Sequence, residues 1–441
     1  MNYPKKPTNR PQNSESAYSM SATSFRSRPV LAALITTAIL TTTTSIATAT
    51  PPDPAPKPGQ DAVLWSGPLP DHGIPGPEHP TRVFTDGTPL DISDDTTFTY
   101  STLNSDNVEI PATALLMRTR RPWTGPGERP LAVIAPVTQG MDDVCAFSNV
   151  VRTGITFSPA HPELSATAPD YFRAHLLLDR GIDVVVTDYP GLGSPGLHPY
   201  MDNVATGRAA ADAGIAALTL LNRPGAPVVA TGHSQGGAAT GWMAENAHEY
   251  TPELNLRAVA VSSPPYNFRQ LTADADGSLA MGLMLMATDT QMRHSPTIRA
   301  EMERILTDEG RQMIEDMRRT CTPGVFLPTA FRKASSLTTT GESLIDVIDR
   351  MPEVGAEFHR QELGTQAPTV PVLLTYHMSD LVVNGHDSKT LGESWRAHGG
   401  DVSVIEAPDS PIARALMTGH PDPAVTHVPP IVDWLARHLE N

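Results

Sequence analysis

The sequence contains only two cysteines among 441 residues, Cys145 and Cys321, and neither stands in a Cys-x-x-Cys motif or a cluster with histidine. A structural zinc site needs about four such ligands close together, so no metal is expected. After the N-terminal region no run of about 18 apolar residues occurs, which excludes a further membrane-spanning helix there. Basic residues number 32 against 48 acidic ones, and this surplus of negative charge argues against nucleic acid as a partner.

The first 49 residues have the pattern of a secretory signal peptide. A basic and polar lead precedes the apolar run "VLAALITTAIL" at 30–40, and Ala47-Thr48-Ala49 fits a small-x-small cleavage site. The lead is long, so translation starts at either Met1 or Met20. The alternative is a membrane anchor, but the run is short for a bilayer span. The sequence therefore predicts a secreted protein, either free or retained in the cell envelope.

Removal of residues 1–49 makes the chain more acidic, and the export that accompanies it places the cysteines in an oxidising environment. The segment carries five basic residues and one acidic residue, so the remaining chain has 27 basic and 47 acidic residues and a net charge of −20. In an exported protein an even pair of cysteines indicates a disulfide, here Cys145 with Cys321. The alternative is two separate buried thiols.

Apolar runs without polar alternation recur from residue 131 onward and are typical of strands buried on both faces. Helical stretches that end at glycine or proline lie between them, as in "DYFRAHLLLDRG" and "GGAATGWMAENAHEY". This alternation predicts an α/β fold with a mainly parallel sheet and helices on both faces. The runs are 131–137, 182–189, 227–232, 256–263, 370–377 and 401–408.

Two segments depart from this alternation of strands and helices, and they define the expected domain organisation. Residues 50–80 are rich in proline and read as an extended segment that leads into the domain. Residues 264–369 show helical patterns and no strong strand, which predicts a helical cap inserted between two core strands. Residues 81–263 and 370–441 then form the two parts of the core. The methionines of the insertion either pack between helices or line a site for an apolar substrate.

Ser234 is the candidate nucleophile. The stretch "GHSQGG" (232–237) follows an apolar strand and opens a helix, so Ser234 stands on a strand-to-helix turn that exposes its hydroxyl at the end of the sheet. Gly232 and Gly236 fit this reading because side chains would clash at such a crowded turn. The backbone N–H of Gln235 is expected to face a developing oxyanion.

An orienting acid and a base complete the expected set. Asp380 directly follows the strand 370–377 and is the candidate acid, whereas Asp387 reads as a helix N-cap. His420 lies between the last strand and the last helix and is the candidate base. Among the alternatives, His427 lies seven residues later and His438 falls within the terminal helix.

The loop after the first core strand and the histidine beside Ser234 also have expected roles. The loop after the first core strand offers Thr138, Gln139 and Gly140 as second oxyanion donors, with the backbone N–H of Gln139 preferred over a plain turn. His233, beside the nucleophile, reads as structural.

Several motifs together resemble the secretory lipase family of the α/β-hydrolase superfamily, which includes yeast lipase A and actinobacterial secreted lipases. The motifs are "TDYPGLG", "HPYMD", "GHSQGG", "HMSDLVV" and "GHPDPAVTHVPPIVDWL". "TQGMDDVCAFS" resembles the family's Gly-Thr-Gln-Gly stretch with its Cys-Ala-Pro-Ser, although Val137 and Phe147 replace a glycine and a proline. The spacing of the family's catalytic histidine from its final helix favours His420. The resemblance implies a capped α/β-hydrolase that cleaves carboxylic esters, commonly acylglycerols, without a cofactor.

The function predicted from these residues is a secreted serine ester hydrolase of the lipase or carboxylesterase type, acting on lipid or acyl esters through an acyl-enzyme. Transient contact with a lipid interface is part of this expectation, and the sequence carries no signal of oligomeric state. An acyltransferase with the same three residues is one alternative. A non-catalytic envelope protein that uses the fold for binding is another.

Overall fold

The central parallel strands of this protein are buried on both faces, as their apolar sequences predict, whereas the edge strand Val402–Ala407 is partly exposed. The structure is a computed structural model that describes residues 63–67, 92–163 and 165–440, all within one unit that runs from Pro54 to Asn441. In β4, Leu131 and Val133 face one apolar core and Ala132 and Ile134 face the other. The predicted signal peptide lies outside the described residues, and so does most of the proline-rich segment.

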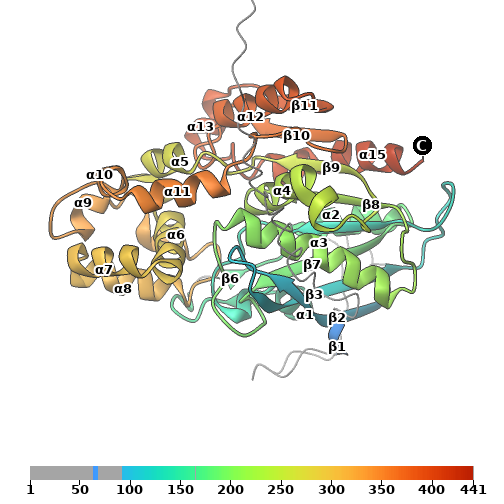
Figure 1. The fold of residues 1–441 in the computed structure, drawn as a ribbon, viewed down its shortest axis with the longest axis horizontal. Coiled ribbons are helices and arrows are strands. Elements are labelled where there is room, and N and C mark those ends of the chain that lie inside the picture. Colours follow the sequence, from blue (N-terminus) through green and yellow to red (C-terminus); the bar gives the residue numbers. More distant parts are fainter. Residues whose placement is uncertain (1–62, 68–91, 164, 441) are drawn as a thin grey trace, which may run out of the picture. The chain divides into compact units, whose positions relative to one another are not determined.

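Nine strands form one sheet in the order β1-β2-β3-β7-β4-β8-β9-β10-β11 (Figure 1). The six strands from β7 to β11 in this order run parallel to their neighbours, and β1, β2 and β3 are antiparallel. The strands are β1 (Val63–Gly67), β2 (Ile92–Leu103), β3 (Glu109–Thr119), β4 (Leu131–Ala135), β7 (Asp183–Pro190), β8 (Val228–His233), β9 (Leu256–Ser262), β10 (Val372–His377) and β11 (Val402–Ala407). The predicted α/β class and mainly parallel sheet are therefore confirmed.

Helices cover both faces of the sheet (Figure 1). Helices α3 (Asn203–Leu220), α4 (Gln235–Tyr250) and α12 (Gly385–Ala397) pack on one face, around Trp242 and Trp395. On the other face lie α1 (Phe147–Thr153), α2 (Asp170–Asp179) and α15 (Val428–Leu439). Short elements complete the core: η1 (Asp143–Cys145), β5 (Thr156–Phe157), β6 (Ser165–Ala166), α13 (Pro411–Ala415) and α14 (Pro423–Thr426).

The chain between β9 and β10 is helical and has an apolar core of its own, to which Met281, Met284, Met286, Met302 and Met317 contribute. We call this segment the cap. Its elements are α5 (Phe268–Ala275), α6 (Met281–His294), α7 (Pro296–Ile305), α8 (Asp308–Met317), η2 (Leu327–Thr329), α9 (Ala334–Leu337), α10 (Leu344–Asp349) and α11 (Pro352–Gln361). The domain limits given above stay predictions.

Two details depart from the sequence expectations. Residues 298–319 read as a continuous helical stretch, but they form two helices because Thr307 caps α8 and accepts a hydrogen bond from the N–H of Gly310. The antiparallel strands β2 and β3 were not predicted. They extend the sheet beyond β7 and bury Phe98 and Tyr100.

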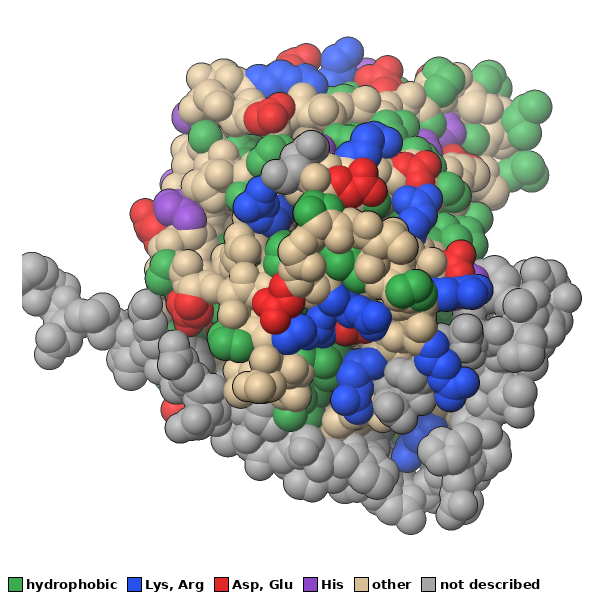
Figure 2. All heavy atoms as spheres, turned by 90° about the vertical axis from the view of Figure 1, so that its right-hand side faces the viewer, with side chains coloured by type: hydrophobic (Ala, Val, Ile, Leu, Met, Phe, Trp, Pro, Cys, Tyr) green, Lys and Arg blue, Asp and Glu red, His purple; other side chains and the backbone are tan. Residues whose placement is uncertain are grey.

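The amino ends of the parallel strands are held by ion pairs. Asp183, at the start of β7, pairs with Arg129 at 3.4 Å and with Arg223. Figure 2 shows the side of the molecule away from the cap helices of Figure 1, and Lys and Arg side chains gather there with acidic neighbours. Since ligands bind at the carboxyl ends of such strands, the cap side of the sheet is the place to examine for a site.

Candidate active site

Ser234 occupies a strained turn between β8 and α4. Its backbone has φ 55° and ψ −120°, a conformation that non-glycine residues rarely adopt. The turn is held because the N–H of Ser234 donates to the carbonyl of Ser262 at 2.8 Å and the N–H of Ala238 donates to the carbonyl of Ser234 at 3.0 Å. The strand-to-helix turn expected from "GHSQGG" is therefore present.

The glycines around Ser234 allow three segments of backbone to meet. A Cβ on Gly236 would collide with the carbonyl oxygen of Ala135, at the end of β4, and a Cβ on Gly232 would collide with the carbonyl of Gly236. Because any side chain would push these segments apart, the close approach explains both glycines. It also places the loop after β4 against the first turn of α4.

Asp380, His420 and Ser234 form one chain of hydrogen bonds across the ends of the parallel strands. Nδ1 of His420 lies 2.7 Å from Oδ2 of Asp380, and Nε2 lies 3.0 Å from Oγ of Ser234. The other carboxylate oxygen of Asp380 accepts the N–H groups of Val382 and Val383 at 2.8 and 2.9 Å. The Asp380 side chain is fully buried and that of His420 is 13% exposed, so the imidazole stays within reach of the cleft.

The alternative acid and bases lie elsewhere. Asp387 falls in the first turn of α12, where Asn384 rather than Asp387 is the N-cap. His427 stands at the junction of α14 and α15, and Nδ1 of His438 lies 2.9 Å from the carbonyl of Trp434 within α15. Of these candidates the structure brings His420 into contact with the serine and Asp380 into contact with His420.

His233 lies beside His420 but points into the core. The two rings are 4.9 Å apart between centroids, and Nδ1 of His233 lies 2.9 Å from Oγ of Ser262. Burial and the neighbouring His420 lower the pKa of His233 well below its ordinary value. His233 is therefore neutral at pH 7, and it adds no positive charge next to an imidazolium at His420.

The side chain of Gln235 is held away from the serine by His198, from the "HPYMD" stretch. Nδ1 of His198 lies 3.1 Å from the carbonyl of Pro190, so in this arrangement Nε2 accepts from Nε2 of Gln235 at 2.7 Å. Burial lowers the pKa of His198 to about 4, which keeps the ring neutral. The N–H of Gln235 is the first of α4 and has no partner within the helix.

The loop after β4 is fixed at Val137, its second residue, by contacts that no sequence motif predicts. The N–H of Val137 donates to Oδ2 of Asp170 at 2.7 Å, and the carbonyl of Val137 accepts from Nε2 of Gln139 at 2.9 Å. Asp170 is buried and pairs with Arg173 at 3.3 Å. Burial raises the pKa of Asp170, and the nearby Arg173 opposes that rise.

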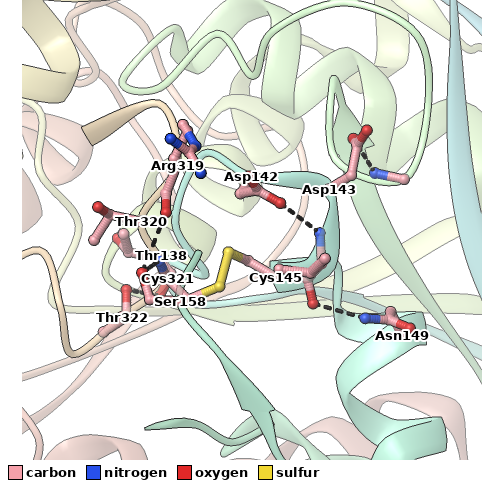
Figure 3. The surroundings of a disulfide bond; sticks show 12 residues. Thr138, Asp142, Asp143, Cys145, Asn149, Ser158, Arg319, Thr320, Cys321 and Thr322 are labelled. Carbon is pink, nitrogen blue, oxygen red and sulfur yellow. Dashed lines mark hydrogen bonds between the residues drawn. A yellow bond between two sulfur atoms is a disulfide. The ribbon is translucent and has the colours of Figure 1, made fainter. Parts of the chain in front are cut away.

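Cys145 and Cys321 form the predicted disulfide (Figure 3). Cys145 follows the loop after β4, and Cys321 follows α8 in the cap. The bond closes a sequence separation of 176 residues. It therefore ties the cap to the segment that carries the candidate oxyanion donors.

A cleft of about 430 Å³ opens beside His420 and Asp380. The core contributes Met378, Leu381 and Met417 to its walls, and the cap contributes Leu279 and Phe331. Phe331 is 61% exposed and Leu381 and Met417 are each 44% exposed, so apolar side chains form an exposed rim. Apolar and polar side chains share the cleft, since Asp274, Asn384 and Arg414 also line it.

Two kinds of feature are absent from residues 63–67, 92–163 and 165–440. No helix in these ranges combines the length and apolar character of a bilayer span. No group of three or more His, Cys, Asp or Glu side chains in them is placed to hold a metal ion.

Comparison with protein families identifies the family of the chain. The sequence model of the family described as secretory lipase matches residues 159–441. The chain belongs to this family. The resemblance that the motifs indicate is thereby confirmed, and family and fold together place the chain among the lipase-like ester hydrolases.

The curated relatives of this chain differ in what their names say. A probable inactive lipase of Mycobacterium tuberculosis, MT1628, is 26% identical over 311 residues, which are 67% of this chain and 68% of the relative. A secreted triacylglycerol lipase of Malassezia furfur, LIP5, is 26% identical over 194 residues, 43% of this chain and 50% of the relative. The matched region thus spans about half the length of that fungal lipase.

Solved structures share the fold of this chain. Candida antarctica lipase A in its closed state superposes with a TM-score of 0.64 at 18% identity, covering 80% of this chain and 78% of that one. A mutant of the rice cell wall degrading esterase LipA from Xanthomonas oryzae gives a TM-score of 0.67 at 19% identity and covers 87% and 100%. At such identities the likeness shows the α/β-hydrolase fold alone.

Proposed function

We propose that this secretory lipase is an active hydrolase of lipid or acyl esters and that Ser234 is its nucleophile. The observation that carries the proposal is the hydrogen-bonded chain from Asp380 through His420 to Ser234. In this proposal His420 accepts the serine proton as Oγ attacks the ester carbonyl, and Asp380 fixes the imidazole tautomer and stabilises its charged form. The C–O bond to the alcohol then breaks as His420 protonates the leaving oxygen.

The remaining steps use backbone donors and water. The N–H groups of Gln235 and Gln139 stabilise the oxyanion that forms on the carbonyl oxygen. A water molecule, deprotonated by His420, attacks the acyl-enzyme, and the acid leaves as the proton returns to Ser234. The apolar rim of the cleft and the family membership support a substrate with a long acyl chain.

The test is an assay of the purified chain on p-nitrophenyl esters from acetate to palmitate. Ser234→Ala should abolish turnover, and Asp380→Asn should lower kcat by about 10⁴ because the amide favours the wrong tautomer of His420. The matched control Asp387→Asn, in the first turn of α12, should retain wild-type kcat. Wild-type protein no faster than Ser234→Ala on every ester would refute the proposal and favour a non-catalytic role, as the name of the mycobacterial relative suggests for that protein.

We also propose that the chain is exported, which the apolar run at 30–40 and the word "secreted" in the names of the Malassezia relatives support. Expression of the full chain in a secreting host and N-terminal sequencing of the product test this. A mature terminus near residue 50 in the medium is expected, whereas intact full-length chain in the membrane fraction would favour an anchor.

A further inference from the structure

A short piece of the cap lies against the loop that carries the candidate oxyanion donors (Figure 3). Gly140 and Cys321 form an antiparallel bridge. The N–H of Met141 donates to the carbonyl of Thr320 at 3.1 Å, and the N–H of Thr322 donates to the carbonyl of Gln139 at 2.9 Å. The disulfide from Cys321 to the following turn of the core holds the two segments together.

Thr322 makes a second contact with this loop, through its side chain. Its hydroxyl donates to the carbonyl of Thr138 at 2.9 Å. The carbonyls of two successive residues, Thr138 and Gln139, therefore both accept from Thr322, one from its hydroxyl and one from its N–H.

These two contacts set the direction of two N–H groups. In a trans peptide the C=O and the N–H point in opposite directions. When the carbonyls of Thr138 and Gln139 face Thr322, the N–H groups of Gln139 and Gly140 face the other way. Successive N–H groups that point to one side form a concave site suited to an anion.

The surroundings leave these donors available next to the nucleophile. Among the residues that the structure describes, the N–H groups of Gln139 and Gly140 donate no backbone–backbone hydrogen bond. The loop begins at Ala135 and Pro136, whose carbonyl oxygens lie against Gly236 in the first turn after Ser234. The side chains of Thr138 and Gln139 are 6% and 5% exposed, so water competes little for the loop.

We propose that Thr322 of the cap is a positioning residue that aims the N–H groups of Gln139 and Gly140 at the oxyanion. This inference rests on the proposed function of Ser234. Thr322 touches no reacting atom. It acts by orienting the donor peptides, so its loss affects the transition state more than substrate binding.

The experiment compares Thr322→Val, which keeps the shape and the N–H but removes the hydroxyl, with Thr322→Ser, which keeps the hydroxyl. Thr322→Val should lower kcat about three- to tenfold, the range for one hydrogen bond, with KM unchanged, and Thr322→Ser should recover most of the activity. Thr329→Val is the matched control. The buried hydroxyl of Thr329 donates to the carbonyl of Val325 at 2.8 Å within the cap, away from the loop.

A second measurement separates positioning from a general weakening of the cap. The inhibition constant of a long-chain trifluoromethyl ketone, which forms an oxyanion on Ser234, should rise in Thr322→Val by the factor by which kcat/KM falls. Binding of an uncleaved ester to Ser234→Ala and to Ser234→Ala/Thr322→Val should agree within twofold. Equal kcat in Thr322→Val and wild type, or an equal loss in Thr329→Val, would overturn the inference while leaving Ser234-dependent activity intact. Absence of that activity in wild type would instead refute the proposed function.

Discussion

Gly419 packs directly against the backbone of Asp380. A Cβ on Gly419 would lie 2.7 Å from the backbone nitrogen of Asp380 and would collide with the carbonyl oxygen of Ser379. The loop that carries His420 therefore approaches the loop that carries Asp380 through a position with no side chain. This contact places the imidazole 2.7 Å from the carboxylate.

Gly419→Ala is predicted to separate His420 from Asp380 and to lower kcat by about 10²-fold, since small misplacements of catalytic groups cost about that much. Steady-state kinetics and the rate of labelling by a fluorophosphonate measure the effect. Gly355→Ala in α11 is the control, because a Cβ there meets nothing within 4 Å. It should keep full activity, and an equal loss in both variants would contradict the explanation.

The rim of the cleft continues onto α13, a helix without a buried residue. Ile412 in this helix is 73% exposed, and Leu416 directly after it is 67% exposed. Replacing both with serine should lower activity on emulsified triacylglycerol several-fold, because less apolar surface contacts the lipid. Activity on a soluble short-chain ester and the melting temperature should change little. Val108→Ser, at a 55% exposed position outside the cleft lining, is the control. Equal losses on both substrates would argue against contact with the interface.

The disulfide should contribute strongly to stability because it closes a long loop. For a separation of 176 residues the chain-entropy estimate is about 5 kcal/mol at 25 °C. Replacing Cys145 and Cys321 with serine should therefore lower the melting temperature markedly, as calorimetry would measure. Reductant should lower that of the wild type toward the same value and leave the double variant unchanged. A wild-type melting temperature insensitive to complete reduction would contradict the prediction.

Stability should fall as the pH rises from about 4 to about 7 because of Asp212. Burial raises the pKa of Asp212 to about 7 in the folded chain, from an ordinary value of 3.8, and the Tyr250 hydroxyl donates to its carboxylate at 2.7 Å. Between these values the folded state binds more protons than the unfolded state, so the free energy of unfolding decreases with pH.

Asp212→Asn removes this titration. Urea unfolding at pH 4.5 and pH 8 should show the variant gaining stability relative to wild type at the higher pH. Because Asp188 and Glu245 also have raised pKa values, the difference between the two proteins is the quantity to compare. A difference that is the same at both pH values would contradict the assignment.

The central part of the fold could be predicted because its strands carry their own signal. The strands β4 and β7 to β10 are buried on both faces by helices and appear as continuous apolar runs, whereas the edge strand β11 is partly exposed. The hairpin of β2 and β3 has mixed polarity, with Phe98 and Tyr100 among threonines, so no run marks it. The remaining signal for this hairpin in the sequence is the turn residue Asn107, which adopts φ 61° between the two strands.

Candidate site residues were predictable where they follow strands. Ser234 and Asp380 stand just beyond strands, and His420 lies between the last strand and the last helix. The chain order of the fold type separates them from other serines, acids and histidines. Thr322 could not be found this way. It meets Thr138 across 184 residues, and neither local periodicity nor a motif records such a pairing. The role of Asp170 could not be predicted for the same reason, since its contact with Val137 is also non-local.

The cap connects two neighbouring parallel strands, leaving the carboxyl end of β9 and returning to the amino end of β10. Strands β9 and β10 are paired in parallel, and the N–H of Ser263 donates to the carbonyl of Thr375 at 2.8 Å. A longer or shorter insertion at this place costs little additional chain entropy. Caps of different length and sequence are thus exchangeable on an unchanged sheet, provided that the incoming segment keeps a cysteine and a hydroxyl at the positions of Cys321 and Thr322. Under the proposed mechanism, substrate preference can then diverge between descendants of one ancestor while Ser234, His420 and Asp380 keep their arrangement.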